Sequence, residues 1–156
     1  MLTMPKQKGF TLLELMIAIG ILAIVSVIAM ANFSGVFRAI SLTSTQKGLV
    51  TDLRAAQANA MNGEFAVKWG VHFVNGATQY YEVFRTPSNY ADVGKVVTAT
   101  TALPASITFT DPGAASVKDI IFDRTTGVAS VSSVTISEGS SGSTATVSVT
   151  ASGIIE

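Results

Sequence analysis

The stretch KGFTLLEL, residues 8–15, decides the fold, because it opens an apolar run that continues to residue 31. Ser26 is the single polar residue in the part of the run from residue 15 onward. From Phe10 the segment spans roughly 33 Å as a helix at ~1.5 Å per residue, and the hydrocarbon core of a bilayer is about 30 Å thick. Basic residues precede the run, so its N-terminal end is expected to stay in the cytoplasm. The sequence therefore predicts a helix that crosses a membrane once.

Three interpretations of this segment compete: a plain membrane anchor, a conventional signal peptide cleaved after Ala31, and a short leader cut after Gly9. Glu14 favours the third, because a carboxylate in a membrane segment costs about 2.5–3.5 kcal/mol at the bilayer centre and less near an interface. After a cut at Gly9, the new ammonium of Phe10 lies one helical turn from Glu14, and the ammonium of a neighbouring subunit can lie as close. A paired carboxylate is penalised far less than an unpaired one in an apolar core. A staggered helix array thereby gains both energy and register.

The same residues resemble the class III signal of type IV pilins and type II secretion pseudopilins, in which glycine, an aromatic residue, Thr-Leu, glutamate and a long apolar run coincide. The resemblance implies that a prepilin peptidase cleaves between Gly9 and Phe10 and N-methylates Phe10. It also implies that Glu14 forms the salt bridge that guides assembly. The apolar side chains expected to pack in a filament core are Leu12, Leu13, Leu15, Ile17, Ile21, Ile24 and Ile28.

The partners implied by this resemblance are other pilin or pseudopilin subunits, in a homo- or hetero-oligomeric filament, together with the prepilin peptidase and an inner-membrane assembly platform. The implied location is the bacterial inner membrane, with one span and the C-terminal domain periplasmic or extracellular. After assembly the chain is expected in a filament.

Residues 32–62 are predicted to continue the helix as an amphipathic segment, with Asn62-Gly63 as its stop. One apolar stripe precedes Gly48 and a second follows it, each with the spacing of a helix face. A stripe of this kind packs either on the sheet of its own chain or between subunits, and both can occur on one helix. The stripes are Phe33, Val36, Phe37 and Ile40, and then Leu49, Leu53, Ala56 and Ala60.

After Gly63 the apolar period changes to two, which is typical of strands. Asn75-Gly76 predicts a type I′ hairpin turn. The expected strands are 66–73, 78–85, 96–101, 106–110, 119–123, 128–137 and 144–150. Antiparallel strands packed on a preceding helix make an α+β fold, here a long pilin-like N-terminal helix on a C-terminal antiparallel β domain. The expected organisation is a leader at 1–9, a transmembrane and filament-core helix at 10–31, its amphipathic continuation at 32–63 and a β-rich domain at 64–156.

The pattern of the last strands resembles the GspH/FimT-like minor pilins and pseudopilins, over roughly residue 49 to the end. Some members of that family bind DNA through a basic C-terminal patch. Here Arg124 is the last base in the sequence, and a phosphate-binding surface needs clustered lysine or arginine. Nucleic acid is therefore not expected as a partner.

The sequence offers little for catalysis or for a bound cofactor. There is no cysteine, which excludes disulfides, thiolate metal sites and cysteine nucleophiles. The only histidine, His72, is predicted in mid-strand in a structural or exposed role. The aspartates Asp111, Asp119 and Asp123 do not match the spacing of a calcium loop, and we expect them to be solvated strand ends. We predict no enzyme activity, no metal and no cofactor.

The function predicted from these observations is that of a structural subunit of a type IV pilus-like filament. The preferred role is a minor pseudopilin of type II secretion or a minor type IV pilin. A major pilin of a long fibre is the alternative within this class. A secreted β-domain binding module with a conventional signal peptide is the alternative from another class.

Overall fold

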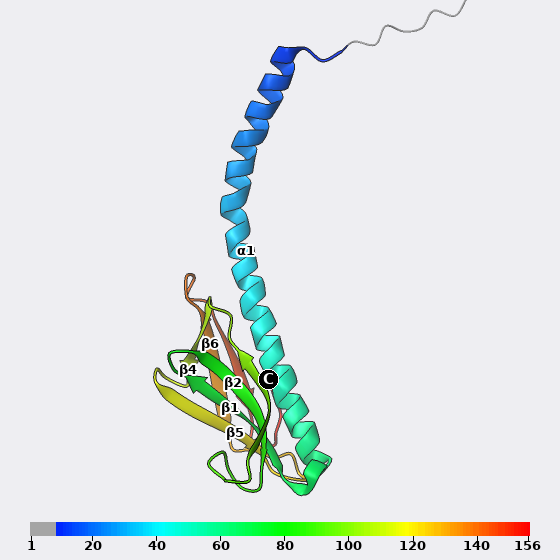
Figure 1. Ribbon diagram of the computed structural model, residues 1–156, viewed down its shortest axis with the longest axis vertical. Coiled ribbons are helices and arrows are strands. Elements are labelled where there is room, and N and C mark those ends of the chain that lie inside the picture. The colour runs from blue at the N-terminus through cyan, green and yellow to red at the C-terminus, as the bar shows by residue number, and fades with distance from the viewer. Residues whose placement is uncertain (1–8) are drawn as a thin grey trace, which may run out of the picture. The chain divides into compact units, whose positions relative to one another are not determined.

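The computed structural model describes residues 9–156, apart from the side chains of residues 30–34. The first eight residues of the predicted leader lie outside this range. The chain divides into two compact units, one that ends at Phe37 and one that comprises Arg38–Glu156. Figure 1 shows a long helix and a group of strands, and the strands belong to the second unit together with the C-terminal part of the helix.

Helix α1 extends over Leu12–Met61, and it runs through the border between the two units. It starts directly after Thr11, and the backbone N–H of Glu14 donates to the Thr11 hydroxyl over 3.2 Å. It ends at Met61, and Gly63, just after the end, has a φ of 65° and donates from its N–H to the carbonyl of Ala60. A glycine in the left-handed region is a common helix stop, and the predicted stop at Asn62-Gly63 is confirmed.

The seven strands form two antiparallel sheets. A short 3-10 helix, η1, at Glu64–Ala66, leads from α1 into the first strand. The four-stranded sheet has the order β3-β2-β1-β5, with β1 Lys68–Asn75, β2 Gln79–Thr86, β3 Val96–Ala102 and β5 Ser116–Phe122. The three-stranded sheet has the order β4-β6-β7, with β4 Ile107–Asp111, β6 Ser132–Glu138 and β7 Thr144–Val149. Helix and antiparallel sheets together confirm the predicted α+β fold.

The core of the domain is formed by one face of α1 and by both sheets. The predicted stripe of Leu49, Leu53, Ala56 and Ala60 is buried, with no member more than 1% exposed. It belongs to the same hydrophobic cluster as side chains of both sheets, including Phe73, Ile120 and Phe109. This stripe therefore packs within its own chain. In the earlier stripe the described side chains stay exposed, by 55% at Val36, 66% at Phe37 and 57% at Ile40.

The predicted type I′ turn at Asn75-Gly76 is wrong. Strand β1 includes Asn75, the connection is residues 76–78, and neither Asn75 nor Gly76 has the positive φ that this turn requires. The Asn75 side chain is buried, and its amide donates to the carbonyls of Phe109 and Pro112 over 3.0 and 2.7 Å. These bonds to the segment around the end of β4 hold Asn75 in the strand, so a tertiary contact overrides the local turn preference.

Two predicted strand starts differ from the structure by three residues or more, and the other boundaries differ by at most two. Strand β5 starts at Ser116, so Asp119 lies inside the strand and not at its end. Strand β6 starts only at Ser132, because residues 128–131 are irregular chain that follows a turn at residues 124–126. In that turn the N–H of Asp123 donates to the carbonyl of Val128, and Gly127 takes a φ of 64°.

Candidate functional site

The N-terminal half of α1 presents an apolar surface that its own unit does not cover. Residues Leu12–Ala29 have a mean hydropathy of 2.7, and the helix is long and apolar enough there to cross a membrane. None of these residues is buried in the structure. Phe10, just before the helix, is 83% exposed. An apolar surface of this size needs a lipid bilayer or other protein around it.

The predicted filament-core residues do not all lie on one side of α1. At ~100° per residue, Ile17, Ile21, Ile24 and Ile28 share one face, and Leu13 lies at the edge of that face. Leu12 and Leu15 lie on other sides of the helix. Among all the predicted filament-core residues, the exposed fraction of the side chain runs from 55% at Leu15 to 77% at Leu12. The structure thus provides one aligned isoleucine stripe and an apolar surface all around it.

The first turn of the helix holds the groups that the sequence singled out. Gly9 and Phe10 lie in irregular chain before α1, and Glu14 is the third helical residue. Thr11 caps the helix through its hydroxyl, so Thr11 and Glu14 have the spacing of a capping box. Among the described residues, the Glu14 carboxylate has no hydrogen-bond or ion-pair partner. The capping role of Thr11 was not predicted, although the Thr-x-x-Glu spacing is visible in the sequence.

Ser26 shows how a hydroxyl is accommodated in the apolar run. Its Oγ donates to the carbonyl of Leu22, one turn earlier, over 2.7 Å. This bond satisfies the hydroxyl inside the helix, as serine commonly does in membrane helices. The polar group therefore does not weaken the assignment of Leu12–Ala29 as a membrane-spanning segment.

Polar side chains of the C-terminal part of α1 bind the helix to the β domain. Gln57 donates from Nε2 to the carbonyls of Gly127 and Gly153 over 2.9 and 2.7 Å. Both glycines have positive φ, and an added Cβ at Gly153 would lie 2.6 Å from the Gly127 carbonyl oxygen. Tyr81 donates to the Asp52 carboxylate over 2.7 Å. Burial and this hydrogen bond raise the pKa of Tyr81, so its hydroxyl stays protonated. These contacts fix the domain on its helix.

Glu138 closes the connection between β6 and β7. Its carboxylate accepts hydrogen bonds from the backbone N–H groups of Ser140 and Ser141 over 3.1 and 2.5 Å. The nearest basic group is Arg38, whose Nε lies 4.0 Å from Oε1. Hydrogen bonds from Ser141, first from its side chain and then from its backbone, lower the pKa of Glu138. This role was not predicted, because the Ser/Gly-rich loop gave no sign that an acid organises it.

The outer face of the four-stranded sheet carries a ladder of polar side chains centred on His72. His72 faces Asp119 on β5 and Glu82 on β2 in the register, and its Nδ1 lies 2.5 Å from Oδ1 of Asp119. Tyr90 stacks on the imidazole with ring centroids 3.5 Å apart and donates to Glu82 over 2.5 Å. The predicted solvated strand end at Asp119 is therefore wrong, since Asp119 is paired with a buried histidine.

The other two aspartates lie at strand ends, but each is paired with a lysine. Asp123 binds Lys68 over 2.6 Å, and Asp111 binds Lys118. Within residues 9–156, no three His, Asp or Glu side chains are close enough together to hold a metal ion. Each of the three aspartates is therefore paired with a basic side chain on a strand.

A membrane-length apolar helix, capped at Thr11 and carrying an acid in its first turn, is joined to a helix-packed β domain. These features fit a pilin-like subunit with a single-pass membrane anchor. A family model described as the prokaryotic N-terminal methylation motif matches residues 4–30. A second model, described as type II transport protein GspH, matches residues 46–153. The chain belongs to the GspH family.

No match was found among the curated proteins or among the solved structures that were searched. The two family matches cover both parts of the chain, the apolar N-terminal segment and the β domain. The chain is thus a pseudopilin-type subunit of the type II secretion and type IV pilus class. Family membership implies processing by a prepilin peptidase and assembly with other subunits, and the apolar helix fits a single-pass anchor in the inner membrane.

Proposed function

We propose that the chain is a minor subunit of a type II secretion pseudopilus or of a type IV pilus, made as a precursor that is cut after Gly9. Cleavage creates an amine at Phe10, which the same peptidase methylates. The observation that carries the proposal is the exposed apolar segment Leu12–Ala29, joined to a domain that matches the GspH family. The domain lies on the periplasmic or extracellular side of the membrane, and an inner-membrane assembly platform moves the subunit into the filament.

In the proposed filament, Glu14 pairs with the Phe10 amine of a neighbouring subunit. The exposure of Phe10 and the lack of a partner for the Glu14 carboxylate among the described residues support this role. The isoleucine stripe from Ile17 to Ile28 packs against neighbouring helices, together with Leu12, Leu13 and Leu15. Burying an apolar side chain of this size contributes about 1.5–3 kcal/mol, so the stripe supplies energy and the Glu14 pair supplies register.

Mass spectrometry of the mature N-terminus tests the processing step. We expect a chain that begins at N-methylated Phe10 when the protein is expressed with its prepilin peptidase. A chain that begins at Asn32 would establish the signal-peptide alternative, and an intact Met1 would establish a plain anchor. Gly9→Val serves as the control, because a side chain at the cut site blocks access of the peptidase, and this variant is expected to keep its leader.

Whether the chain is a minor or a major subunit is tested by its molar fraction in the filament. Quantitative mass spectrometry of sheared, purified filaments measures the molar ratio of this chain to the other subunits. A minor subunit is expected to contribute a small fraction of the total. If this chain is the most abundant subunit, it is the major pilin of the fibre.

A further inference from the structure

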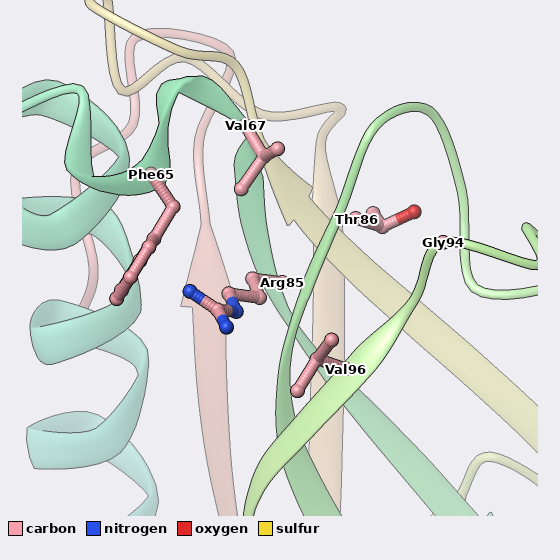
Figure 2. Close-up of a pocket in the computed structure, with 6 residues that line it drawn as sticks. All are labelled: Phe65, Val67, Arg85, Thr86, Gly94 and Val96. Carbon is pink, nitrogen blue, oxygen red and sulfur yellow. The ribbon is translucent and has the colours of Figure 1, made fainter.

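Arg85 on β2 lies in a pocket of about 240 Å³ on the sheet edge next to η1. The pocket is lined by Phe65, Val67, Arg85, Thr86, Gly94 and Val96. Figure 2 shows the Arg85 side chain pointing toward Phe65, with Val96, Thr86 and Gly94 on its other side. We call this the Arg85 pocket.

The guanidinium in this pocket lacks an acceptor. Its Nη1 is buried and has no hydrogen-bond partner, and Arg85 forms no ion pair with any residue in the described range. Lys118, which is also half-buried, donates both to Asp111 and to the carbonyl of Ser133. A buried charged donor without an acceptor is unfavourable. Arg85 therefore offers a buried charged donor to which a carboxylate can bind.

Phe65 covers the guanidinium, and its backbone is strained. The Arg85 Cζ lies 3.6 Å from the centroid of the Phe65 ring. Phe65 and Ala66 both have a φ of 55°, a region that side chains other than glycine rarely adopt. Strain of this kind persists where the surrounding structure imposes it and is concentrated at binding sites. The ring nevertheless remains 63% exposed, so it offers a partner an apolar surface directly beside the charge.

Strand β3, which borders the pocket, is an unprotected sheet edge. It is the terminal strand of its sheet, and all of its seven residues are exposed. Its sequence, VVTATTA, contains neither a charge nor a proline, which are two of the means by which proteins block an edge. The opposite edge strand, β5, carries Lys118 and Asp119. An edge of this type accepts a further extended strand through its backbone groups.

The two features are connected by the register. Val96, the first residue of β3, lies directly opposite Arg85. A strand added outside β3 would run two inter-strand spacings from β2, or about 10 Å at ~4.8 Å each. A long acidic side chain on that strand, beside Val96, reaches over the valine toward the guanidinium of Arg85.

We propose that β3 and the Arg85 pocket together bind an extended, carboxylate-bearing segment of a neighbouring filament subunit. The backbone of this segment adds to the edge of β3, and its carboxylate accepts hydrogen bonds from Arg85. The inference rests on the proposed function, because it takes the partner to be another subunit. The positive charge of Arg85 favours an acidic segment. The open backbone groups along the edge of β3 favour a segment in extended conformation.

Binding of designed peptides to the full-length chain in detergent micelles tests this inference. The probes are seven-residue peptides of alternating threonine and valine, blocked at both ends, with one central glutamate or one central glutamine. We expect the glutamate peptide to bind at least about tenfold more tightly, because a charge-assisted pair is stronger than a neutral one. Backbone amide exchange at residues 96–102 should slow when this peptide is bound. Equal affinity of the two peptides, or unchanged exchange in β3, would overturn the proposal.

Variants then assign the difference to Arg85. Arg85→Gln is expected to abolish the preference for the glutamate peptide. Arg85→Lys keeps the charge but loses the planar fork, and should retain part of the preference. Lys47→Gln, at an exposed position on α1, changes the net charge equally and should leave the preference intact. If Lys47→Gln reduces the preference as much as Arg85→Gln does, the effect is nonspecific and the proposal fails. The comparison of the two peptides on the unmodified chain stands even if an Arg85 variant folds poorly.

These measurements are independent of leader processing. If the peptides bind as expected but the mature chain does not begin at Phe10, the surface is real and its partner is not a filament subunit. If the mature chain begins at Phe10 but the peptides do not discriminate, only the proposal for the Arg85 pocket is refuted.

Discussion

At the scale of single residues, Glu14 has two roles that cannot be told apart in the sequence. Its backbone N–H takes part in the cap made by Thr11, and its carboxylate remains without a partner among the described residues. The first role stabilises the end of the helix within one chain. The second leaves a negative charge at the start of an apolar segment, where it is unfavourable unless another charge meets it. Separate substitutions therefore distinguish the cap from the proposed pairing.

We predict that Glu14→Ala leaves cleavage intact but strongly impairs incorporation into filaments. Removing one member of a buried ion pair costs about 3–5 kcal/mol, because the other charge is left unpaired. Thr11→Ala removes the cap, which is typically worth about 1 kcal/mol, and keeps the carboxylate. Immunoblots of sheared filament fractions against membrane fractions measure incorporation. Normal incorporation of Glu14→Ala, or an equal defect in Thr11→Ala, would contradict the pairing role.

At the scale of elements, the connection between β6 and β7 depends on one ionised side chain. The Glu138 carboxylate accepts from two successive backbone N–H groups of the connection. The lowered pKa of Glu138 means that the folded state stabilises the ionised carboxylate more than the unfolded state does. This contribution to the free energy of unfolding is fully present above the pKa of Glu138 in the unfolded chain, near 4.5. It is lost as the pH falls through the lower pKa of the folded state.

Glu138→Gln is therefore expected to be less stable than the unmodified chain at pH 7 and to approach it in stability as pH falls below about 4.5. Urea unfolding of the full chain in micelles, followed by circular dichroism between pH 7 and pH 3, measures this convergence. Glu64→Gln, at an exposed position, is the matched control and should change stability little at any of these pH values. A stability difference between Glu138→Gln and the unmodified chain that stays constant with pH would refute the role of the charge.

At the scale of the whole molecule, the hydrophobic core formed by the described side chains lies within the second unit. The members of the core cluster run from Leu42 to Ile155, and the exposed apolar segment contributes none of them. The two units therefore have different requirements: the first needs a membrane or other subunits, and the second supplies its own buried surface.

A chain that starts at Arg38 is accordingly predicted to fold in the absence of detergent. Circular dichroism should show both helix and strand, and thermal unfolding should be cooperative. The full chain, handled in the same buffer, is expected to require detergent because Leu12–Ala29 remains exposed. An unfolded spectrum for the shortened chain would show that the N-terminal segment is needed for the domain to form.

The sequence predicted the features that depend on local patterns. The apolar run, the buried stripe around Leu53 and the stop at Gly63 follow from periodicity and from the preference of glycine for positive φ. The errors arose where distant segments meet. Asn75 remains in its strand because its amide binds a segment more than thirty residues away, and Asp119 pairs with His72 across two strands. The Arg85 pocket escaped prediction for the same reason, since its lining comes from three separate elements.

The position of the helix start has a consequence for processing. Gly9 and Phe10 precede the first helical residue, Leu12, so the bond proposed for cleavage lies in non-helical chain that a protease can bind in extended form without unwinding α1. Cleavage there would create a cation at the positive end of the helix dipole, where it is disfavoured by about 0.3–1 kcal/mol. Methylation keeps this positive charge. The acid at Glu14 thus offsets a local repulsion that the cut itself would introduce, before any neighbouring subunit is present.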